Sequence, residues 1–179
     1  PHVTLADLAG HSDGLIALTA AGEGALARLY ADGRHDAAEA WCDRLQALFP
    51  DRLYIELARR GDPVEEAAED ALIALAYARD LPLVASNPAR YAEPQFHAAH
   101  DAMLCIANST HIDAAERPRS GRQDWVKSAE MMAELFADLP EDARLLCVGA
   151  GTGAEIAHLA RRFPRWRFLA LDPSAQMIE

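Results

Sequence analysis

Three glycines at alternate positions near the C-terminus carry the most specific chemistry in the chain. They form the segment Gly149-Ala-Gly151-Thr-Gly153, directly after an apolar run. Glycine permits a tight turn and a close approach of a ligand to the backbone, and a following helix would offer free N–H groups. A second apolar run ends on Asp172, about 19 residues further on. A carboxylate there can accept hydrogen bonds from two ribose hydroxyls. These three glycines and Asp172 are the candidate cofactor-binding residues.

His97 and His100 are a second candidate site, because residues three apart on an expected helix can share a metal ion. No cysteine or carboxylate completes a ligand set at a fitting spacing, since Asp101 lies on another side of that helix. We therefore expect His100 to be packed with its ring N–H satisfied, and His97 to be solvated.

Arg117, Arg119 and Arg122 lie in a polar segment, residues 107–124, which predicts a surface loop. Their guanidinium groups could contact a nucleic-acid phosphate or an acidic partner. The net charge of −11 argues against a stand-alone nucleic-acid-binding protein, because phosphate binding needs clustered positive charge. A solvated loop without direct nucleic-acid contact is the expected outcome.

The composition is that of a globular chain. Its 179 residues correspond to one large or two small domains, and a hydrophobic content of 51% supports a core. Cys42, Cys105 and Cys147 lie far apart in apolar contexts, which predicts buried free thiols and a cytoplasmic location. No apolar run reaches the roughly 20 residues needed to span a bilayer, so no membrane partner is expected. Both ends of the sequence have the look of truncation, since it starts at Pro1 and stops within a pattern.

The elements that must position these residues alternate between strands and helices. Apolar runs predict strands at residues 14–19, 53–57, 83–85, 144–148 and 166–171. Helices are expected between them and in the stretch from residue 94 to residue 140. This alternation predicts an α/β fold with a mainly parallel sheet covered by helices.

Local signals give several of the helix starts. Asp36 and Glu39 have the spacing of a capping box, and Asp62-Pro63 places proline at the first helical position. Ser128 is an expected N-cap. Leu53, Ile55 and Leu57 alternate with Tyr54 and Glu56, which predicts a strand.

Five segments of the first 140 residues resemble the PHP domain of the alpha subunit of bacterial DNA polymerase III, or of its error-prone paralogue. Their order and spacing agree with that family, and the resemblance extends over about residues 5–140. The segments are GLIALT (14–19), FPDRLYIEL (49–57), ALIALAYARDLPLVASN (71–87), AHDAMLCIA (99–107) and KSAEMMAELFADLP (127–140).

The resemblance implies a distorted (βα)₇ barrel that can hold metal ions for phosphoester hydrolysis. It covers only the second half of that domain, so a first half with an HxH motif would precede Pro1. The polymerase palm, fingers and thumb would follow Pro140. The expected fold is therefore a partial (βα) PHP-type barrel, residues 1–141, with the remaining residues forming a separate unit.

Two metal-ligand patches of the family fall within the chain, and both have lost their histidines. The pattern E-x-x-x-H-G corresponds to Glu56-Leu-Ala-Arg-Arg60-Gly61, and N-D-x-H corresponds to Asn87-Pro88-Ala89-Arg90. Arginine has no lone pair to donate to a metal, and proline has no side-chain ligand atom. Glu56, the single surviving family ligand, cannot build a multinuclear site alone. We predict no metal site and no catalytic residues.

Residues 143–179 resemble the first βαβ unit of a class I S-adenosylmethionine-dependent methyltransferase, a Rossmann-like fold. The glycine loop alone also fits dinucleotide-binding units, but the continuation Asp172-Pro-Ser-Ala-Gln-Met177 favours the methyltransferase class. The resemblance implies S-adenosylmethionine as cofactor, although a two-strand piece would give it only one wall. The boundary between the two units is expected at residues 138–143, which gives units 1–141 and 142–179.

The leading hypothesis is a fragment of a DNA polymerase III alpha subunit with a structural, catalytically degenerate PHP part, carrying a truncated methyltransferase unit. Its partners would be the polymerase core or other replisome subunits. Exposed strand edges also predict self-association of the isolated chain. The alternatives are the N-terminal portion of a methyltransferase and a degenerate metal-dependent phosphoesterase.

Overall fold

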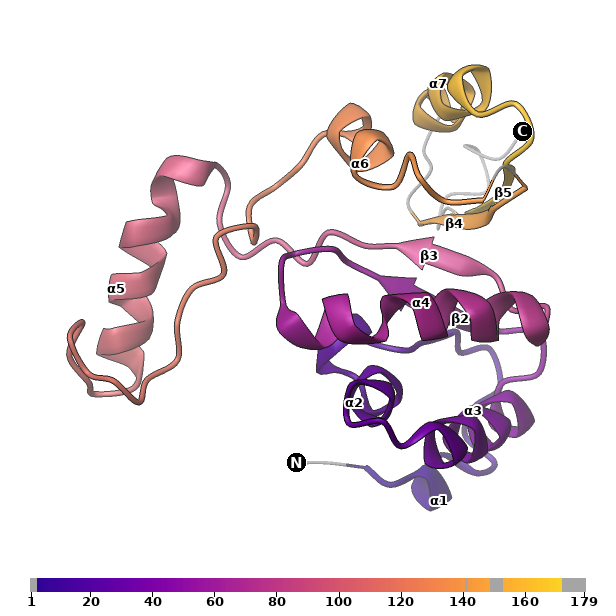
Figure 1. Cartoon of the computed structure of the whole chain (residues 1–179), viewed down its shortest axis with the longest axis horizontal. Helices are drawn as coiled ribbons and strands as arrows, with labels where there is room; N and C mark the ends of the chain where they lie inside the picture. The colour runs from indigo at the N-terminus through magenta and orange to yellow at the C-terminus, as the bar shows by residue number, and fades with distance from the viewer. Residues whose placement is uncertain (1–2, 141, 149–152, 172–179) are drawn as a thin grey trace.

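The five strands within the described residues form one parallel sheet in chain order. A computed structural model of the chain describes residues 3–140, 142–148 and 153–171 (Figure 1). The sheet order is β1-β2-β3-β4-β5, and every pairing is parallel. The strands are β1 (Ala17–Leu18), β2 (Leu53–Leu57), β3 (Leu83–Ala85), β4 (Arg144–Val148) and β5 (Arg167–Leu171). The predicted α/β class and all five predicted strands are therefore confirmed, with β1 shorter than expected.

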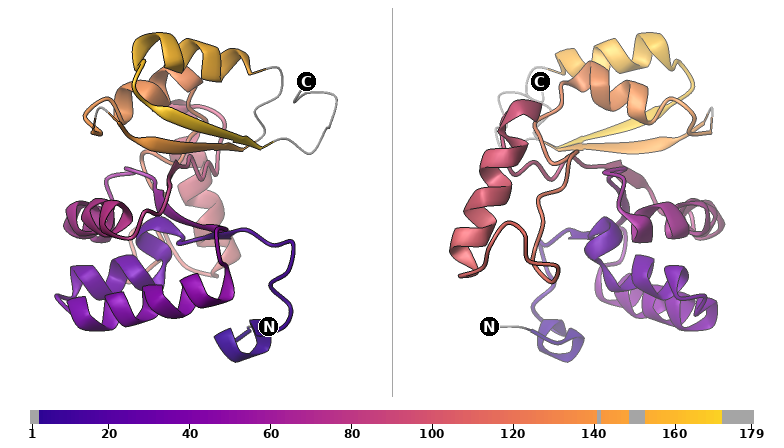
Figure 2. Two further views of the ribbon diagram at one scale, coloured as in Figure 1. Left: turned by 90° about the vertical axis from the view of Figure 1, so that its right-hand side faces the viewer. Right: turned by 60° about the vertical axis from the view of Figure 1, so that its left-hand side comes forward.

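Helices cover the sheet in two groups. Close to β1–β3, α2 packs against both α3 and α4, whereas α6 and α7 lie side by side over β4 and β5 (Figure 2). Among the described residues, no helix is both long and apolar enough to cross a membrane. The helices are α1 (Leu5–Leu8), α2 (Ala25–Ala31), α3 (His35–Leu48), α4 (Pro63–Ala78), α5 (His97–Ala107), α6 (Ala129–Leu135) and α7 (Ala154–Arg162), with 3₁₀ turns η1 (Ala21–Glu23) and η2 (Pro94–Phe96).

Two of the predicted helix caps are present. The Asp62 carboxylate accepts from the backbone N–H groups of Val64 and Glu65 at 2.8 and 3.3 Å, and Pro63 opens α4. The Ser128 hydroxyl accepts from the Met131 N–H at 3.3 Å and starts α6. Each cap satisfies backbone donors that the first helical turn leaves without partners.

The predicted capping box at Asp36 is wrong. Helix α3 begins at His35 with Arg34 as its N-cap, and no side chain caps it. Gly33 has φ +70°, and the Arg34 N–H donates to the Leu29 carbonyl at 2.8 Å, so the chain reverses tightly from α2 into α3. Asp36 therefore lies within the first turn, where a carboxylate interacts favourably with the helix dipole.

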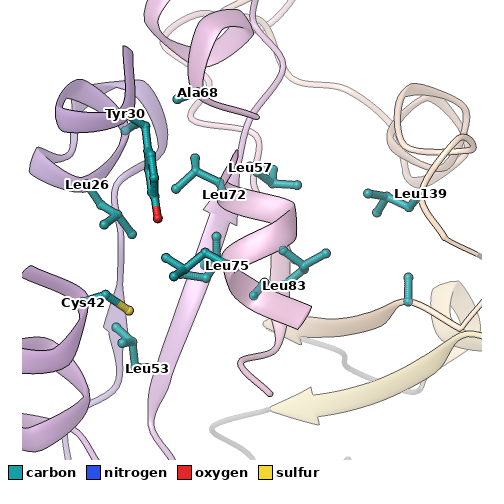
Figure 3. Close-up of a cluster of buried hydrophobic side chains, with 14 of the residues drawn as sticks. Leu26, Tyr30, Cys42, Leu53, Leu57, Ala68, Leu72, Leu75, Leu83 and Leu139 are labelled. Carbon is teal, nitrogen blue, oxygen red and sulfur yellow. The ribbon is translucent and has the colours of Figure 1, made fainter. Parts of the chain in front are cut away.

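One main hydrophobic core joins α2, α3 and α4 to the sheet and to the C-terminal elements (Figure 3). Cys42, buried with no disulfide partner, belongs to it, and Cys105 is likewise a buried free thiol. The side chain of Cys147 lies outside the described residues. Leu83 of β3 pairs in register with Leu145 of β4, and both are buried in this core. Packing is thus continuous across residues 138–143, and the division there stays a prediction from sequence.

The opposite face of the sheet is only partly covered. Tyr54 is 4% exposed and packs with Val84 in a second small cluster. Leu18 and Leu169 are 43% and 47% exposed. The strand prediction for β2 is thus confirmed, and Tyr54 is buried in a cluster separate from the main core.

Candidate functional site

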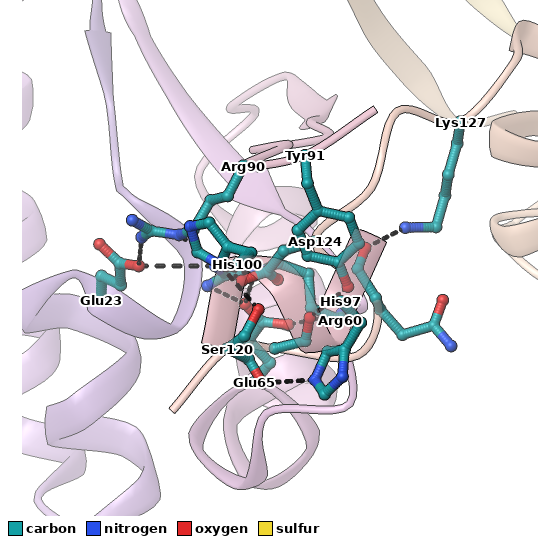
Figure 4. Close-up of polar contacts among 12 residues, drawn as sticks. Glu23, Arg60, Glu65, Arg90, Tyr91, His97, His100, Ser120, Asp124 and Lys127 are labelled. Atoms are coloured by element: carbon teal, nitrogen blue, oxygen red, sulfur yellow. Dashed lines mark hydrogen bonds and ion pairs between the residues drawn. The ribbon is translucent and has the colours of Figure 1, made fainter. Parts of the chain in front are cut away.

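The sharpest concentration of charge lies where β2 and β3 end. Because the carboxyl ends of parallel strands meet at one edge of a sheet, the segments after β2 and β3 come close together. After β2, Arg59 (φ +50°) and Gly61 (φ +75°) turn the chain on either side of Arg60. After β3, the chain runs to Arg90 and then into α5. Figure 4 shows Arg60 and Arg90 converging from these two segments.

Arg60 is held by a buried carboxylate. Its Nε and Nη2 donate to Glu65 Oε1 at 2.9 and 2.7 Å, and its backbone N–H donates to Glu65 Oε2 at 2.8 Å. The two side chains are 11% and 5% exposed. Burial acts to lower the pKa of Arg60, but its hydrogen bonds and the neighbouring negative charges outweigh burial and raise it.

Asp124 and Glu23 bridge the two arginines. Arg60 Nη1 lies 3.9 Å from Asp124 Oδ1, and Arg90 Nε lies 3.5 Å from Asp124 Oδ2. Glu23 Oε1 lies 3.5 Å from Arg60 Nη1 and 3.1 Å from Arg90 Nη2. Asp124 is 6% exposed, so the guanidinium groups supply the charge that keeps its carboxylate in a buried position. We call Glu23, Arg60, Glu65, Arg90 and Asp124 the arginine–carboxylate cluster.

A cavity of about 550 Å³ adjoins this cluster. Arg119 and Arg122 line it from the segment before Asp124, and both are exposed as predicted. Lys127 also lies near the cluster: burial lowers its pKa, the Asp124 charge opposes this effect, and Arg60 adds to it. The site is therefore built from cations and carboxylates that neutralise one another.

Glu56 and Asn87, which belong to the two patterns that resemble metal-ligand patches, both make structural contacts. The Glu56 carboxylate accepts from the Ala20 N–H at 2.9 Å, and it forms none of the ion pairs of the cluster. With its amide oriented to satisfy both neighbours, Asn87 donates to the Trp125 carbonyl at 3.1 Å and accepts from the Lys127 N–H at 2.8 Å. Across the described ranges, no three His, Cys, Asp or Glu side chains group in a way that could hold a metal ion.

The two candidate histidines share one partner, Ser120. His100 Nδ1 lies 2.8 Å from Ser120 Oγ, which confirms its expected packed role. His97 Nε2 lies 3.1 Å from the Ser120 carbonyl oxygen, so the prediction of a solvated His97 is wrong. The reason is that the segment after α5 folds back along the helix and buries Ser120 to 9% exposure. The Tyr91 ring contacts both imidazoles.

Arg117 is not a solvated loop residue. Its guanidinium binds Asp101 through two hydrogen bonds of 2.7 and 2.9 Å, and its side chain is only 3% exposed. The Ser120 N–H donates to the same carboxylate at 2.9 Å. Asp101 therefore fastens the 108–124 segment to α5, and it shares Ser120 with both histidines instead of pointing away from them. The prediction of a solvated loop holds for Arg119 and Arg122 but is wrong for Arg117.

This fastening should be sensitive to acid. Hydrogen bonds from Arg117 and from the Ser120 N–H hold the pKa of Asp101 below its usual range. A depressed carboxyl pKa stabilises the fold above the unfolded-state pKa of about 3.9, and the contribution is lost as pH falls through the lower folded-state value. We expect the urea concentration at the unfolding midpoint to decrease as the pH falls below about 4. The Asp101→Asn variant should lose part of this pH dependence. Parallel pH profiles for the two proteins would contradict this assignment.

The predicted cofactor loop is described only at its end. Gly149, Gly151 and Asp172 lie outside the described residues. Gly153 has φ +71° and immediately precedes α7, a backbone conformation that favours glycine. Strands β4 and β5 pair in parallel with α7 between them in the chain, as the motif predicts.

Sequence reasoning missed three of the five residues in the arginine–carboxylate cluster. Glu65 lies just after the predicted helix start at Asp62-Pro63, and Asp124 ends the predicted polar loop, but neither is predicted to be a site residue. The pattern offers one weak signal for Glu65, which follows Arg60 across a Gly-Asp-Pro turn. No local signal marks Glu23 or Asp124, because tertiary structure alone brings them to the arginines.

Comparison with known proteins identifies most of the chain. No protein-family model matches it. It is 44% identical over 141 residues to DNA polymerase III subunit alpha of Caulobacter vibrioides, which covers 79% of this chain and 12% of that protein. The same subunit of Rickettsia bellii is 37% identical over 139 residues (78% and 12%), and that of Pseudomonas aeruginosa 39% identical over 131 residues (73% and 11%). The chain spans about 12% of the length of these relatives. It therefore contains a segment related to DNA polymerase III alpha subunits.

Proposed function

We propose that residues 1–141 are a structural part of a PHP-type domain of a DNA polymerase III alpha subunit, in which ion pairs have replaced bound metal. The observation that carries this proposal is the convergence of Arg60 and Arg90 on Asp124. In the resemblance to the PHP family, both arginines occupy positions where the family has histidine ligands.

Arginine in place of a divalent metal ion explains why such a site can remain folded. Buried carboxylates need nearby positive charge, and a divalent ion or a guanidinium can supply it. Arginine stays charged at any working pH and offers five N–H donors, but it has no lone pair for a metal. Arg60 and Arg90 thus preserve the local charge balance and remove the coordination chemistry needed for phosphoester hydrolysis.

The role that follows is scaffolding within a replication complex. Relatives named DNA polymerase III subunit alpha support a replisome context for the parent protein, for which a cytoplasmic location is part of the proposal. The segment would pack against the polymerase core or another replisome subunit. It would not contact nucleic acid directly, because the carboxylates of the cluster offset its arginines and the chain carries a net charge of −11.

Metal binding tests this proposal directly. After dialysis, the wild-type chain should hold no stoichiometric zinc or manganese by elemental analysis. The variant Arg60→His, Arg90→His offers two imidazoles beside the Glu23 and Asp124 carboxylates, which are zinc-type donors. We expect zinc to raise the melting temperature of this variant and to leave that of the wild type unchanged. Stoichiometric metal in the wild type, with a phosphodiesterase activity lost in Glu56→Gln, would overturn the proposal.

The C-terminal unit favours a second candidate function. We infer that residues 142–179 derive from the first βαβ unit of an S-adenosylmethionine-dependent methyltransferase, in which Gly149, Gly151, Gly153 and Asp172 would line the cofactor. The parallel β4–α7–β5 unit, with Gly153 at positive φ before α7, supports this origin. Residues 142–179 would supply one wall of such a site, so we expect calorimetry on this chain to detect no S-adenosylmethionine binding below about 1 mM. Micromolar binding that Asp172→Ala abolishes would instead favour a methyltransferase.

A further inference from the structure

A further cavity lies at the opposite edge of the sheet, where the strands begin. It has a volume of about 540 Å³, and it shares no lining residue with the cavity beside the arginine–carboxylate cluster. Tyr54, Pro82, Arg144 and Arg167 line it at the starts of β2, β3, β4 and β5. Small-molecule sites commonly have volumes in this range. We call it the strand-start cavity.

These four residues form a row across the sheet. The register of β2, β3 and β4 places Tyr54, Pro82 and Arg144 side by side, one residue before the paired positions. Arg144 is itself the register partner of Arg167 in β5. Because neighbouring strands lie about 4.8 Å apart, the row spans roughly 15 Å. It begins with a phenol, continues with a proline ring and ends with two guanidinium groups.

The arginine end of the row carries an uncompensated positive charge. Arg144 and Arg167 are direct neighbours on adjacent strands, where like charges repel one another. The Arg144 guanidinium pairs with the Asp80 carboxylate. Arg167 is exposed, and within the described residues it forms no ion pair with a carboxylate. An anion between the two guanidinium groups would relieve their repulsion, and arginine binds carboxylate and phosphate oxygens in bidentate fashion.

The other charged groups of the lining do not compensate Arg167. Asp80 is already paired with Arg144. Asp51 precedes β2, which β3 and β4 separate from β5 in the sheet. Arg79, the third arginine of the lining, is paired with carboxylates of α3. Arg167 is therefore the cation of this cavity that is left for an anion.

Tyr54 supplies a buried polar group at the other end of the row. It is 4% exposed, and its hydroxyl makes no hydrogen bond to any residue in the ranges 3–140, 142–148 and 153–171. A buried tyrosine hydroxyl usually finds a partner. Because Tyr54 lines the cavity, an acceptor atom of a bound molecule would satisfy this donor. The hydroxyl is a sign of a ligand that is independent of the charge on Arg167.

The middle of the row is apolar. Pro82 lies between Tyr54 and Arg144, and Leu81 and Phe49 line the cavity as well. An apolar wall with a few polar groups at defined places is the usual composition of a small-molecule site. A flat ring system would fit between the phenol and the guanidinium groups.

We propose that the strand-start cavity binds a small organic anion in which a flat ring system carries a carboxylate or a phosphate. The anionic group would lie between Arg144 and Arg167, and the ring system would lie over Pro82. An acceptor atom at the far end of the ring system would take the hydrogen bond from Tyr54. Residues 1–141 supply the phenol and the proline, whereas residues 142–179 supply both arginines, so the site requires both predicted units.

Isothermal titration calorimetry of the full chain with naphthoate and naphthyl phosphate tests the proposal. We expect at least one of the two to bind with a dissociation constant below about 1 mM. The tighter of the two distinguishes a carboxylate ligand from a phosphate ligand. Naphthol and inorganic phosphate, which each lack one of the two parts, should bind at least about tenfold more weakly. None of these probes contains ribose, so they do not report on the glycine loop before α7.

Variants locate the bound anion. Arg167→Gln should raise the dissociation constant of the tighter anion at least about tenfold. Arg122→Gln is the matched control, because it removes the same charge from an exposed arginine of the cavity beside the cluster, and it should leave the dissociation constant unchanged. Circular dichroism melts of each variant check that the fold is retained.

The Tyr54 hydroxyl has its own test. Hydroxynaphthoate, with its hydroxyl at the opposite end of the ring system from the carboxylate, should bind the wild type about threefold or more tightly than naphthoate. Tyr54→Phe removes only the phenolic oxygen and should abolish that difference.

Three results would overturn the proposal. The first is that neither anion binds at millimolar concentration, and the second is that naphthol binds as tightly as the anions. The third is that Arg122→Gln weakens binding and Arg167→Gln does not, which would place the anion beside the arginine–carboxylate cluster.

Discussion

Replacing Arg60 with alanine should lower the free energy of unfolding by about 3–5 kcal/mol, the usual cost of breaking a buried ion pair from one side. The substitution leaves the Glu65 carboxylate, 5% exposed, without the guanidinium that donates two hydrogen bonds to it. It also removes one of the two guanidinium groups that pair with the buried Asp124. Urea unfolding, followed by tryptophan fluorescence and circular dichroism, measures the effect.

Arg90→Ala is the matched control, since Arg90 contacts the same Asp124 and Glu23 carboxylates. Its side chain is 49% exposed, so water can replace much of what it provides, and its loss should cost about 1 kcal/mol or less. The double variant Arg60→Met, Glu65→Leu removes both partners of the buried pair and should be more stable than Arg60→Ala. If Arg60→Ala and Arg90→Ala lowered the free energy of unfolding equally, the buried Arg60–Glu65 pair would not be the main stabilising contribution.

The sequence was sufficient to predict those elements whose structure depends only on residues that are neighbours in the chain. Apolar runs bounded by turn residues located all five strands, and Asp62-Pro63 marked the start of α4 because a cap needs only adjacent residues. The one helix cap that was predicted wrongly, at Asp36, also has a local explanation. Gly33, at positive φ, lets α3 begin at once after α2, and the tight reversal outweighs the Asp36 spacing.

The candidate site was only half predictable. The prediction that no metal is bound rests directly on Arg60 and Arg90, because a guanidinium cannot coordinate a metal wherever it lies. The ion pairs of these arginines with Asp124 could not be predicted, since Asp124 reaches them only through tertiary structure. Arg117 illustrates the same limit: in sequence it belongs to a polar loop, and only folding of that loop onto α5 pairs it with Asp101.

Phe136→Ala should also destabilise the chain by about 3–5 kcal/mol, as large-to-small changes at fully buried aromatic residues do. Phe136 follows α6, is 1% exposed, and belongs to the main core that also contains Leu145 and Trp166. Its ring lies 4.7 Å from the Arg59 guanidinium, which in turn pairs with Glu69 of α4 at 2.6 Å. The residue therefore couples α6 and the C-terminal strands to the first half of the chain.

Met131→Ala provides the comparison on the same helix. Met131 is 47% exposed, so its truncation removes little buried surface and should change the free energy of unfolding by no more than about 0.5 kcal/mol. If Phe136→Ala instead cost less than about 1 kcal/mol, the segment after Lys127 would not share the core of the first half. Phe136 would then not link α6 and the C-terminal strands to the core of the first half. If the core is continuous across residues 138–143, both variants should unfold in a single cooperative transition. Only Phe136→Ala should shift the midpoint of that transition.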